Sequence, residues 1–203
     1  MAASPKTIAA RLWSFIRRKT SQQYKFDQQF AGGVWDGLAA PGESGRYSII
    51  VGYTGMFCPG ARILDLGCGA GVLQERFANT NYASYTGIDF SAVAIEKARQ
   101  QEDARTRFAV GDLNKLNIEG EFDAIIYNES IYYLSDPIAA IKALFKTLAP
   151  GGVFIFSIVD KHGKEQTSLW NPINELLDLQ DKTKVINGQG HAWTVHVYKL
   201  KQG

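Results

Sequence analysis

Short apolar runs alternate with helical patterns along most of this chain. Residues 62–66, 84–88, 107–110, 122–127 and 153–159 form runs short enough to be buried strands. Segments with apolar residues at helical spacing follow the first, second and fourth runs. Strands that alternate with helices in this way form a parallel sheet covered on both faces. The pattern therefore predicts an α/β fold.

Capping and breaking residues mark the ends of the predicted helices. Ser91 is a typical N-cap for a helix over residues 92–99, which are rich in good helix formers. Pro137 opens another helix at its favoured first position, and we expect this helix to reach Leu148. The sequence Pro-Gly-Gly at residues 150–152 then stops it.

The last third of the chain has a different pattern. A helix is expected over residues 172–179, followed by strands over residues 184–187 and 192–200. The loop between these strands, Gly188-Gln189-Gly190, is short and rich in glycine, as in a hairpin. The final strand should therefore run antiparallel to its partner.

The first 58 residues lie outside the predicted sheet. Residues 7–20 have the pattern of a basic amphipathic helix, residues 31–45 are loop-like, and residues 46–57 form an apolar helix. We expect residues 1–58 to form a helical lid over the substrate and residues 59–203 to form the main domain. The basic helix suits an RNA-facing or membrane-surface role, or a lid helix with one solvated face.

Composition narrows the class of protein only slightly. The chain has 203 residues, with 22 basic and 20 acidic side chains, so its overall charge does not point to nucleic acid. Two cysteines, Cys58 and Cys68, indicate no disulfide framework and suit a reducing compartment. No run of 18 apolar residues and no signal-peptide pattern is present, so we expect a cytoplasmic protein without a membrane span.

A glycine-rich turn follows the first predicted strand. Gly67, Gly69 and Gly71 occupy alternate positions, which the interior of a strand or helix would not favour. Glycine has no Cβ, so such a loop turns sharply and lets a ligand approach the backbone. Strand, glycine loop and helix together open a nucleotide-binding α/β sheet, although a tight connection without a ligand has the same pattern.

Polar side chains follow each of the first four strands. Asp65 belongs to the first strand, Asp89 ends the second, Asp112 follows the third, and Asn128-Glu129 follows the fourth. The carboxyl ends of parallel strands meet in one crevice, which is the expected ligand site. Asp89 lies 18 residues after Gly71, close to the offset at which an acid binds ribose hydroxyls. The arrangement predicts a nucleoside cofactor.

The glycine spacing argues against a dinucleotide. A Rossmann fingerprint reads Gly-x-Gly-x-x-Gly and presents a helix N-terminus to a pyrophosphate. Here the three glycines alternate, and Asp65 lies two positions before Gly67. An acid at the mouth of the loop would repel phosphates and favour an ammonium group.

The pattern Asp-x-Gly-x-Gly-x-Gly resembles motif I of the class I S-adenosylmethionine-dependent methyltransferases. The resemblance extends over roughly residues 60–200 and includes the acid of the second strand, Gly-Asp after the third, and Phe-Asp-Ala-Ile-Ile in the fourth. It also includes Leu-x-Pro-Gly-Gly at residues 148–152 and the terminal hairpin. It implies a Rossmann-like, seven-stranded, mostly parallel sheet with helices on both faces and a C-terminal antiparallel β-hairpin.

The resemblance implies S-adenosyl-L-methionine as the cofactor and assigns a role to each motif. Asp65 and the loop backbone would hold the methionine part, Asp89 the ribose hydroxyls, and Asn128 would lie beside the sulfonium. Phe90 would lie against the adenine, Asp112 would accept from its amino group, and Leu113 would supply a backbone contact. Trp35 and Arg46 would clasp the cofactor from the lid, although a tryptophan of the lid core and a surface arginine are equally consistent. The expected cofactor-binding residues are Trp35, Arg46, Asp65, Gly67, Cys68, Gly69, Gly71, Asp89, Phe90, Asp112, Leu113 and Asn128.

Candidate bases follow the fourth and fifth strands. An amine acceptor has only to be unprotonated, whereas an alcohol needs a base. We expect His162, after the fifth strand, to be the base, although a solvated loop histidine has the same sequence signature. Glu129 is the second candidate catalytic residue. His191 and Tyr132 are further candidates, and His196 is expected in the core.

The sequence after the fourth strand narrows the acceptor. Members that methylate nucleobase amino groups or glutamine carry Asn/Asp-Pro-Pro-aromatic there, whereas this chain has Asn-Glu-Ser-Ile at residues 128–131. We therefore expect methyl transfer to nitrogen or oxygen of a small molecule, such as a sugar or secondary metabolite, with no metal. The alternatives are an RNA methyltransferase that uses the basic helix at residues 11–19, and a protein that keeps the fold without catalysis. The oligomeric state does not follow from the sequence.

Overall fold

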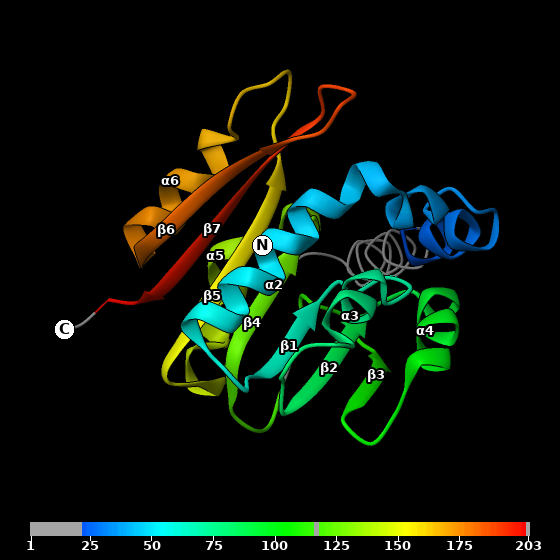
Figure 1. Ribbon diagram of the computed structural model, residues 1–203, viewed down its shortest axis with the longest axis horizontal. Coiled ribbons are helices and arrows are strands. Elements are labelled where there is room, and N and C mark those ends of the chain that lie inside the picture. The colour runs from blue at the N-terminus through cyan, green and yellow to red at the C-terminus, as the bar shows by residue number, and fades with distance from the viewer. Residues whose placement is uncertain (1–21, 116–117, 202–203) are drawn as a thin grey trace, which may run out of the picture.

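The computed structural model describes residues 22–115 and 118–201 of the chain. They form a seven-stranded sheet with helices on both faces (Figure 1). Across the sheet the strands are ordered β3-β2-β1-β4-β5-β7-β6. The strands are β1 (Arg62–Leu66), β2 (Ser84–Asp89), β3 (Thr106–Val110), β4 (Phe122–Asn128), β5 (Leu148–Val159), β6 (Leu177–Ile186) and β7 (Ala192–Leu200).

The strand directions confirm the predicted mostly parallel sheet. Strands β1 to β5 are parallel to their neighbours, whereas β7 runs antiparallel to both β5 and β6. The chain leaves β1 toward β2 on one side and returns to pair β4 on the other. The carboxyl ends of β1 and β4 therefore flank the point where the strand order reverses, which is where open α/β sheets bind ligands.

Each face of the sheet has its own apolar core. On β1, Ile63 belongs to one core cluster, and Leu64 and Leu66 belong to the other. Side chains that alternate between two buried faces explain why the strand reads as one apolar run. Helices α2 (Ser44–Phe57), α3 (Val72–Phe77) and α4 (Ala92–Ala98) contribute to the first cluster, and α5 (Pro137–Ala143) and α6 (Thr167–Leu176) to the second.

The predicted helix over residues 137–148 is too long. Helix α5 ends at Ala143, a short 3₁₀ turn covers residues 145–147, and β5 already begins at Leu148. Leu148 pairs with Phe122 of β4, and the register shifts before Ala124 pairs with Val153. Pairing with β4 thus extends the strand through the Pro-Gly-Gly segment, which local propensity marks as a break.

The region after β5 also differs from the prediction. The expected helix over residues 172–179 is displaced, because α6 covers Thr167–Leu176 and contains Pro172. Strand β6 begins at Leu177 rather than at residue 184. This strand lies at the edge of the sheet and most of its side chains are exposed, so it lacks the apolar run of a buried strand.

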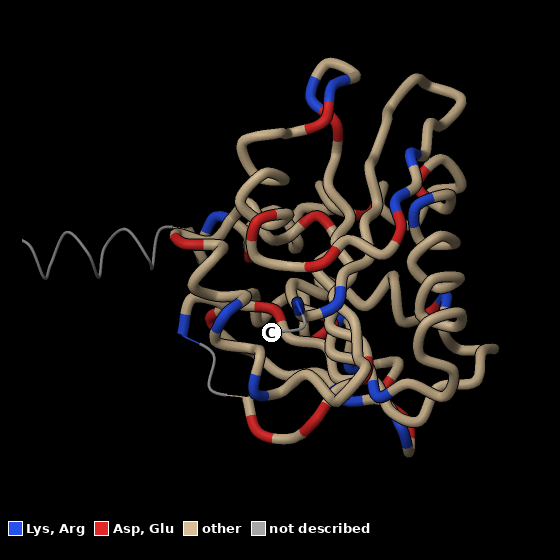
Figure 2. Tube along the Cα trace, turned by 90° about the vertical axis from the view of Figure 1, so that its left-hand side faces the viewer, with Lys and Arg blue, Asp and Glu red and all other residues tan. Residues whose placement is uncertain are grey.

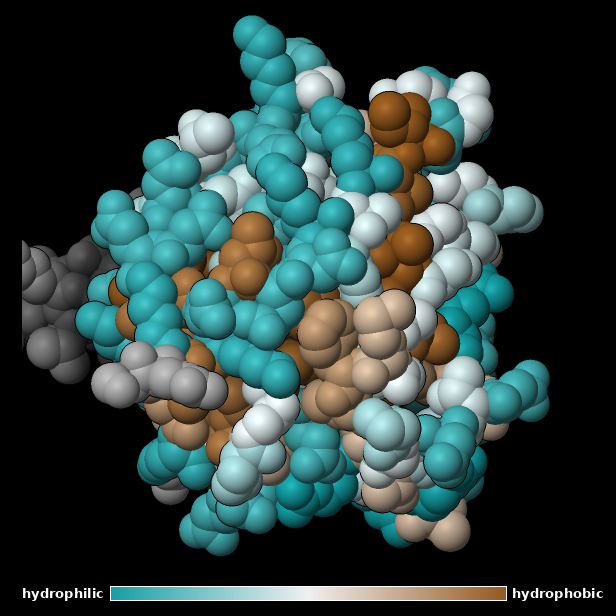
Figure 3. Space-filling view, turned by 60° about the vertical axis from the view of Figure 1, so that its left-hand side comes forward, coloured by the Kyte–Doolittle hydropathy of each residue, from teal (hydrophilic) through white to brown (hydrophobic). Residues whose placement is uncertain are grey.

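The edge strand β6 carries charges that discourage pairing with another chain. Asp178, Asp181, Lys182 and Lys184 lie along it, and charged side chains protect exposed strand edges. On the face seen in Figure 3, apolar side chains form separate patches among hydrophilic ones. Figure 2 shows basic and acidic positions interspersed along the described chain, without a single basic surface in that view.

The segment before α2 contains more helix than predicted. Residues 22–31 are helical, and two 3₁₀ turns, Asp36–Ala39 and Pro41–Glu43, interrupt the expected loop. The basic helix predicted over residues 7–20 lies outside the described residues. Within the described part of the chain, no helix has the length and apolar character needed to cross a membrane.

Candidate active site

A cavity of about 1080 Å³ opens at the carboxyl ends of the parallel strands. The glycine loop after β1, the ends of β2 to β4, the helix at residues 22–31 and Trp193 of β7 line it. Of the predicted cofactor residues, those that line the cavity are Trp35, Arg46, Gly67, Cys68, Gly69, Asp89, Phe90, Asp112, Leu113 and Asn128. Strand ends that are far apart in sequence thus build one site, as the parallel topology requires.

The three loop glycines all adopt positive φ angles. The angles are 84° at Gly67, 55° at Gly69 and 84° at Gly71, a region that side chains disfavour. A Cβ at Gly67 would collide with the side chain of Ser130, which follows β4. A Cβ at Gly71 would lie 2.7 Å from the amide oxygen of Gln101. The loop therefore needs glycine for its own backbone and for close packing against the β4 end.

Asp89 is a structural acceptor as well as a cavity residue. Its Oδ2 accepts from the Gly69 N–H at 3.0 Å and its Oδ1 from the Ser91 N–H at 2.9 Å. Burial raises the pKa of this carboxyl group, and the backbone N–H groups partly oppose that effect. Asp89 thus ties the glycine loop to the start of α4 while it faces the cavity.

Asp65 lies beneath the glycine loop rather than at its mouth. It is 1% exposed, and it is not among the described residues that line the cavity. Its Oδ2 accepts from the Tyr85 hydroxyl at 2.5 Å, and its Oδ1 has no partner among the described residues. Burial raises the pKa of Asp65 to about 7. The prediction that Asp65 lies at the mouth of the glycine loop is therefore wrong.

The β3 end contributes Asp112 and Leu113, as predicted. Asp112 Oδ1 accepts from the backbone N–H of Asn114 at 3.0 Å and from the Asn114 side-chain amide at 3.2 Å. Leu113 packs against the second core cluster and also lines the cavity. Cys68 is buried, and burial raises its pKa well above that of an ordinary thiol, so it is a small apolar filler of the loop.

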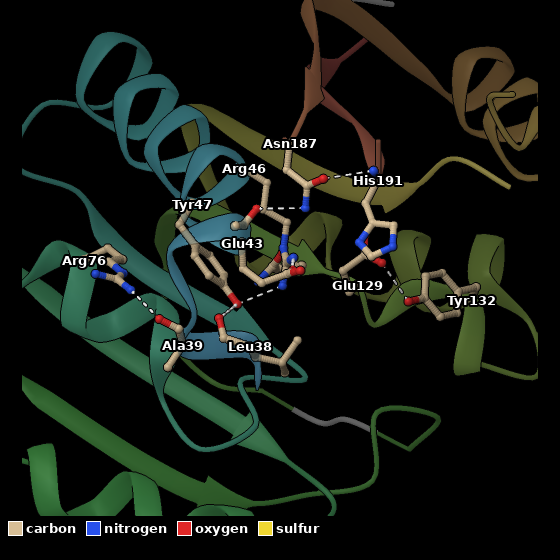
Figure 4. A network of polar contacts seen from close by, with 12 residues as sticks. Leu38, Ala39, Glu43, Arg46, Tyr47, Arg76, Glu129, Tyr132, Asn187 and His191 are labelled. Carbon is tan, nitrogen blue, oxygen red and sulfur yellow. Dashed lines mark hydrogen bonds and ion pairs between the residues drawn. The ribbon is translucent and has the colours of Figure 1, made fainter. Parts of the chain in front are cut away.

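Arg46 of α2 is the only basic side chain among the described residues lining the cavity, and it is 2% exposed. Its guanidinium pairs with Glu43, donates to the Tyr47 hydroxyl at 2.8 Å, and donates from Nε to Asn128 Oδ1 at 3.3 Å (Figure 4). It also lies over the rings of Tyr47 and Trp193. A hydrogen bond thus connects two of the predicted cofactor residues, Arg46 and Asn128.

Glu129 follows β4 with a strained backbone and a partly unpaired carboxylate. Its φ angle is 57°, which is uncommon outside glycine. Oε2 accepts from the Tyr132 hydroxyl at 2.9 Å, whereas Oε1 is buried and has no partner among the described residues. Burial raises the pKa of Glu129 to about 7, and Arg46 and Tyr132 oppose that rise. A carboxyl group of this kind is poised to exchange a proton near neutral pH.

The three histidines lie away from the cavity wall. His162 is exposed in the turn after β5, with a φ angle of 52°, and does not line the cavity, so its position does not suit a base there. His191 is also exposed, and in the view of Figure 4 its ring is turned toward Glu129. His196 is 2% exposed, which confirms that it lies in the core.

Several aromatic residues of the cavity were not predicted from the sequence. The Phe26 ring stacks on Trp35 at a centroid distance of 5.8 Å and meets Phe90 edge-on at 5.0 Å and Tyr133 at 5.3 Å. The indole N–H of Trp35 is buried and has no partner among the described residues. Trp193 was also missed, because an aromatic residue in a core strand carries no signal of a ligand.

Hydrogen bonds tie the helix at residues 22–31 to the segment after β2 and to α4. The Gln23 amide donates to the Phe90 carbonyl at 2.9 Å, and the Ser91 hydroxyl donates to Asp27 at 2.5 Å. Lys97 of α4 donates to the Phe30 carbonyl at 2.7 Å. The predicted lid thus contacts the β2–α4 connection directly.

The lining of the cavity is strongly acidic. Among the described residues that line it, six carry carboxyl groups and Arg46 alone carries a cation, so an incoming anion meets more repulsion than attraction. Among the described residues, no group of three or more His, Cys, Asp or Glu side chains is placed to hold a metal ion. The six acidic lining residues are Asp36, Glu43, Glu75, Asp89, Asp112 and Glu129.

Comparisons with known proteins agree with this architecture. Residues 58–199 match the family described as methyltransferase domain. A ubiquinone biosynthesis O-methyltransferase of Psychrobacter cryohalolentis is 32% identical over 112 residues, which cover 52% of this chain and 43% of that protein. A malonyl-[acyl-carrier protein] O-methyltransferase of Bacillus anthracis is 32% identical over 128 residues, 61% of this chain and 47% of that protein. The chain thus spans less than half the length of these two relatives.

A solved structure is similar over most of its length. The N-methyltransferase NodS of Bradyrhizobium japonicum WM9, in complex with S-adenosyl-L-homocysteine, has a TM-score of 0.70 to this chain at 21% identity. The likeness covers 83% of this chain and 92% of that one. At this level of identity the similarity shows the fold.

Replacement of Asp65 by Asn should stabilise the protein in a pH-dependent way. The carboxyl pKa is about 7 in the folded protein and near 4 in the unfolded chain. Stability is therefore lost as pH rises from about 4 to about 7, where the buried group must ionise. Asn keeps an acceptor for Tyr85 without the charge. We expect the variant to melt roughly 5 °C or more above the parent at pH 8, and near it at pH 4.5.

A suitable control is Asp123→Asn, because the Arg62 guanidinium holds the pKa of Asp123 below its usual range. Its stabilising effect is present above the unfolded pKa and is lost as pH falls, which is the opposite sign. Thermal unfolding of both variants at the two pH values provides the measurement. Equal melting shifts for Asp65→Asn at both pH values would contradict the assignment.

Proposed function

Because the chain belongs to the methyltransferase domain family, of the class I S-adenosylmethionine-dependent type, we propose that it methylates nitrogen or oxygen of a small molecule. The observation that carries the proposal is the shared cavity. One cavity is lined both by ten of the twelve predicted cofactor residues and by Glu129, whose carboxylate has a buried oxygen without a partner among the described residues. The proposed cofactor site and the proposed acceptor group would thus share one cavity.

The residues present fit S-adenosylmethionine. The volume of about 1080 Å³ is at the upper end of small-ligand sites, so it suits a cofactor together with a small acceptor. Two buried polar atoms of lining residues, the Trp35 indole N–H and Glu129 Oε1, have no partner in the part of the chain that the structure describes. Buried polar groups normally have partners, so these atoms indicate a ligand. The acidic lining suits a cofactor that carries a sulfonium and an ammonium group.

The adenosine end of the proposed cofactor lies at the ends of β2 and β3. Asp89 would accept from the ribose hydroxyls with its remaining lone pairs, since each oxygen already accepts one backbone N–H. Phe90 would pack on the adenine, and Asp112 and Leu113 would contact its amino edge. Phe26 meets Phe90 edge-on, so the lid helix would cover the same ring.

The methionine end would lie over the glycine loop and beside Arg46. When bound, the cofactor supplies an electrophilic methyl group on sulfur. The loop backbone at Gly67 and Gly69 and the Trp35 N–H would bind the amino-acid part, with Asn128 held by Arg46 at the sulfonium side. Asp65 would act from below the loop through burial and charge, since it does not reach the cavity surface.

We propose that Glu129 binds the acceptor and takes up its proton. It replaces His162 in this role, because His162 lies outside the cavity wall. Positioning of the acceptor in line with the methyl–sulfur bond, and exclusion of water by the lid, would supply most of the rate enhancement. Tyr132 orients the carboxylate by donating to Oε2.

The remaining parts of the proposal concern location and partners. A small acceptor is favoured over nucleic acid because the described residues of the cavity lining include six acids and one arginine. We also propose a cytoplasmic location, which suits the free cysteines Cys58 and Cys68. Residues 1–58 are proposed as the lid and residues 59–203 as the cofactor-binding domain, with Arg46 and Glu43 of the lid reaching the cavity.

The proposal is tested by a methyl-transfer screen with S-adenosylmethionine and panels of sugars, amines and phenols. We expect S-adenosylhomocysteine to accumulate with at least one small acceptor and a methylated product of matching mass. A structured RNA serves as the competing substrate class. Turnover on RNA alone would contradict the small-molecule assignment, and absence of cofactor binding would contradict the whole proposal.

Replacement of Asp89 by Ala should weaken cofactor binding. Loss of charge-assisted bonds of this kind costs roughly 1.5–3 kcal/mol, which corresponds to a Kd about 10- to 100-fold higher. Calorimetric titration with S-adenosylmethionine and S-adenosylhomocysteine measures the change. Asp178→Ala, which removes an exposed carboxylate from β6 outside the cavity, should leave both affinities unchanged. Unaltered affinity in a folded Asp89→Ala protein would show that another group anchors the ribose.

The rate should depend on the ionisation of Glu129. The carboxylate form accepts the proton, and burial raises the Glu129 pKa to about 7, so kcat/KM should fall as pH drops through about 7. Glu129→Gln should lower kcat roughly 100-fold or more and remove this acidic limb of the pH profile, the fall in kcat/KM below about pH 7. His191→Gln, which removes the histidine turned toward Glu129 in Figure 4, should retain it. If the limb disappears with His191→Gln instead, the base is misassigned.

A further inference from the structure

The acceptor end of the cavity has a distinct set of charges. With the cofactor at the ends of β1 to β3, the space left lies beside Glu43, Arg46, Glu129, Tyr132 and Trp193. Trp193 pairs with Val159 of β5, two residues beyond Ser157, whose carbonyl accepts the Glu129 N–H at 2.9 Å. These side chains therefore come from the Pro41–Glu43 turn, from α2, from the segment after β4 and from β7.

The single cation at this end is already engaged. Arg46 pairs with Glu43, donates to Tyr47 and Asn128, and lies over the Trp193 ring. Its charge is thus neutralised by protein groups, and an anionic acceptor would have to displace Glu43. Glu129, in contrast, has a buried oxygen with no partner among the described residues. A ligand that donates a hydrogen bond or carries a positive charge would satisfy that oxygen.

Aromatic rings form the walls beside this carboxylate. Tyr132 and Tyr133 lie with ring centroids 4.7 Å apart, and Trp193 of β7, whose ring is covered by the Arg46 guanidinium, lines the same cavity. Rings of this kind bind apolar ligand bodies and attract cations through their faces. A buried carboxylate with surrounding aromatic rings is the combination that suits an ammonium group.

We propose that the acceptor is an amine carried on an aromatic or apolar body, with its nitrogen at Glu129. The inference rests on the proposed methyltransferase function and narrows its acceptor. A phenol or a carboxylic acid must place negative charge on oxygen before attack, and five further acids line the same cavity. An amine instead arrives as a cation and reacts as a neutral group, so the acidic lining favours its binding.

The transfer balances without any further reactant. The bound ammonium gives one proton to the Glu129 carboxylate, and the freed nitrogen lone pair attacks the methyl carbon. The nitrogen–carbon bond forms as the carbon–sulfur bond breaks, and its electron pair stays on sulfur as a neutral thioether. The product is a methylated ammonium ion, which carries the positive charge that the sulfonium has lost. Glu129 then returns its proton to water as the product leaves.

Four probes that share a phenyl ring and a two-carbon arm test the acceptor class. Phenethylamine presents an ammonium group, and tyramine presents an ammonium group and a phenol. The other two probes are para-ethylphenol, which presents a phenol, and hydrocinnamate, which presents a carboxylate. Binding is measured by calorimetry on the full chain saturated with S-adenosylhomocysteine. Transfer is measured with S-adenosylmethionine, and mass spectrometry locates the methyl group on tyramine.

We expect the two amines to bind at least 10-fold more tightly than the phenol or the carboxylate, and tyramine to be methylated on nitrogen. Glu129→Gln should weaken amine binding at least 10-fold with unchanged affinity for S-adenosylhomocysteine. Glu175→Gln removes an exposed carboxylate from α6, outside the cavity lining, and should change amine binding less than about twofold.

Each remaining outcome overturns the inference. Preferred binding of the phenol or carboxylate, methylation of tyramine on oxygen, or failure of both amines to bind while S-adenosylhomocysteine binds would each exclude an amine acceptor of this type. The proposed methyltransferase function would survive those results. Failure of S-adenosylhomocysteine itself to bind the folded protein would instead contradict the proposed function.

Discussion

The parallel sheet ends its strands at one edge, and this constraint decides where charge is buried. Asp65 and Asp89 lie at the ends of β1 and β2, and Glu129 follows β4 beside β5; burial raises the pKa of all three carboxyl groups. Burial of carboxylates is unfavourable unless donors or cations compensate for the lost water. The protein compensates two of them only partly, because Asp65 and Glu129 each keep one oxygen without a partner in the described structure. This arrangement lowers the stability of the fold, and the carboxylates responsible lie in and under the candidate site.

The glycine loop makes this burial sterically feasible. Its positive φ angles bring the backbone against the Ser130 side chain. The backbone N–H groups of Gly69 and Ser91 both donate to the Asp89 carboxylate and hold it in place. A side chain at Gly67 would push β1 and β4 apart where the strand order reverses. The alternating glycines therefore serve the packing of the sheet as much as the approach of a ligand, and the two needs coincide at the same positions.

Sequence patterns predicted the parts of the structure that repeat a general rule. The strand over Arg62–Leu66, the Ser91 cap and the order of polar residues at strand ends all follow from local chemistry and parallel topology. The patterns failed where contacts distant in sequence decide the structure. Pairing with β4 extends β5 back to Leu148, and the exposed edge strand β6 has no apolar run that would reveal it. In the site, the depth of Asp65 and the engagement of Arg46 by Glu43 depend on packing, which spacing along the chain does not encode.

Two acids of similar pKa thus have different consequences because of their positions. Asp65 is bonded to Tyr85 under the loop and is not among the described cavity-lining residues, so its ionisation acts on the loop and on stability. Glu129 lines the cavity, with Tyr132 on one oxygen and no partner on the other, so its ionisation acts on whatever enters. Arg46 opposes the raised pKa of Glu129 only in part, because burial has the larger effect and the guanidinium also pairs with Glu43 and donates to Asn128. The acceptor end therefore remains acidic, and this imbalance selects for an acceptor that brings a proton or a positive charge.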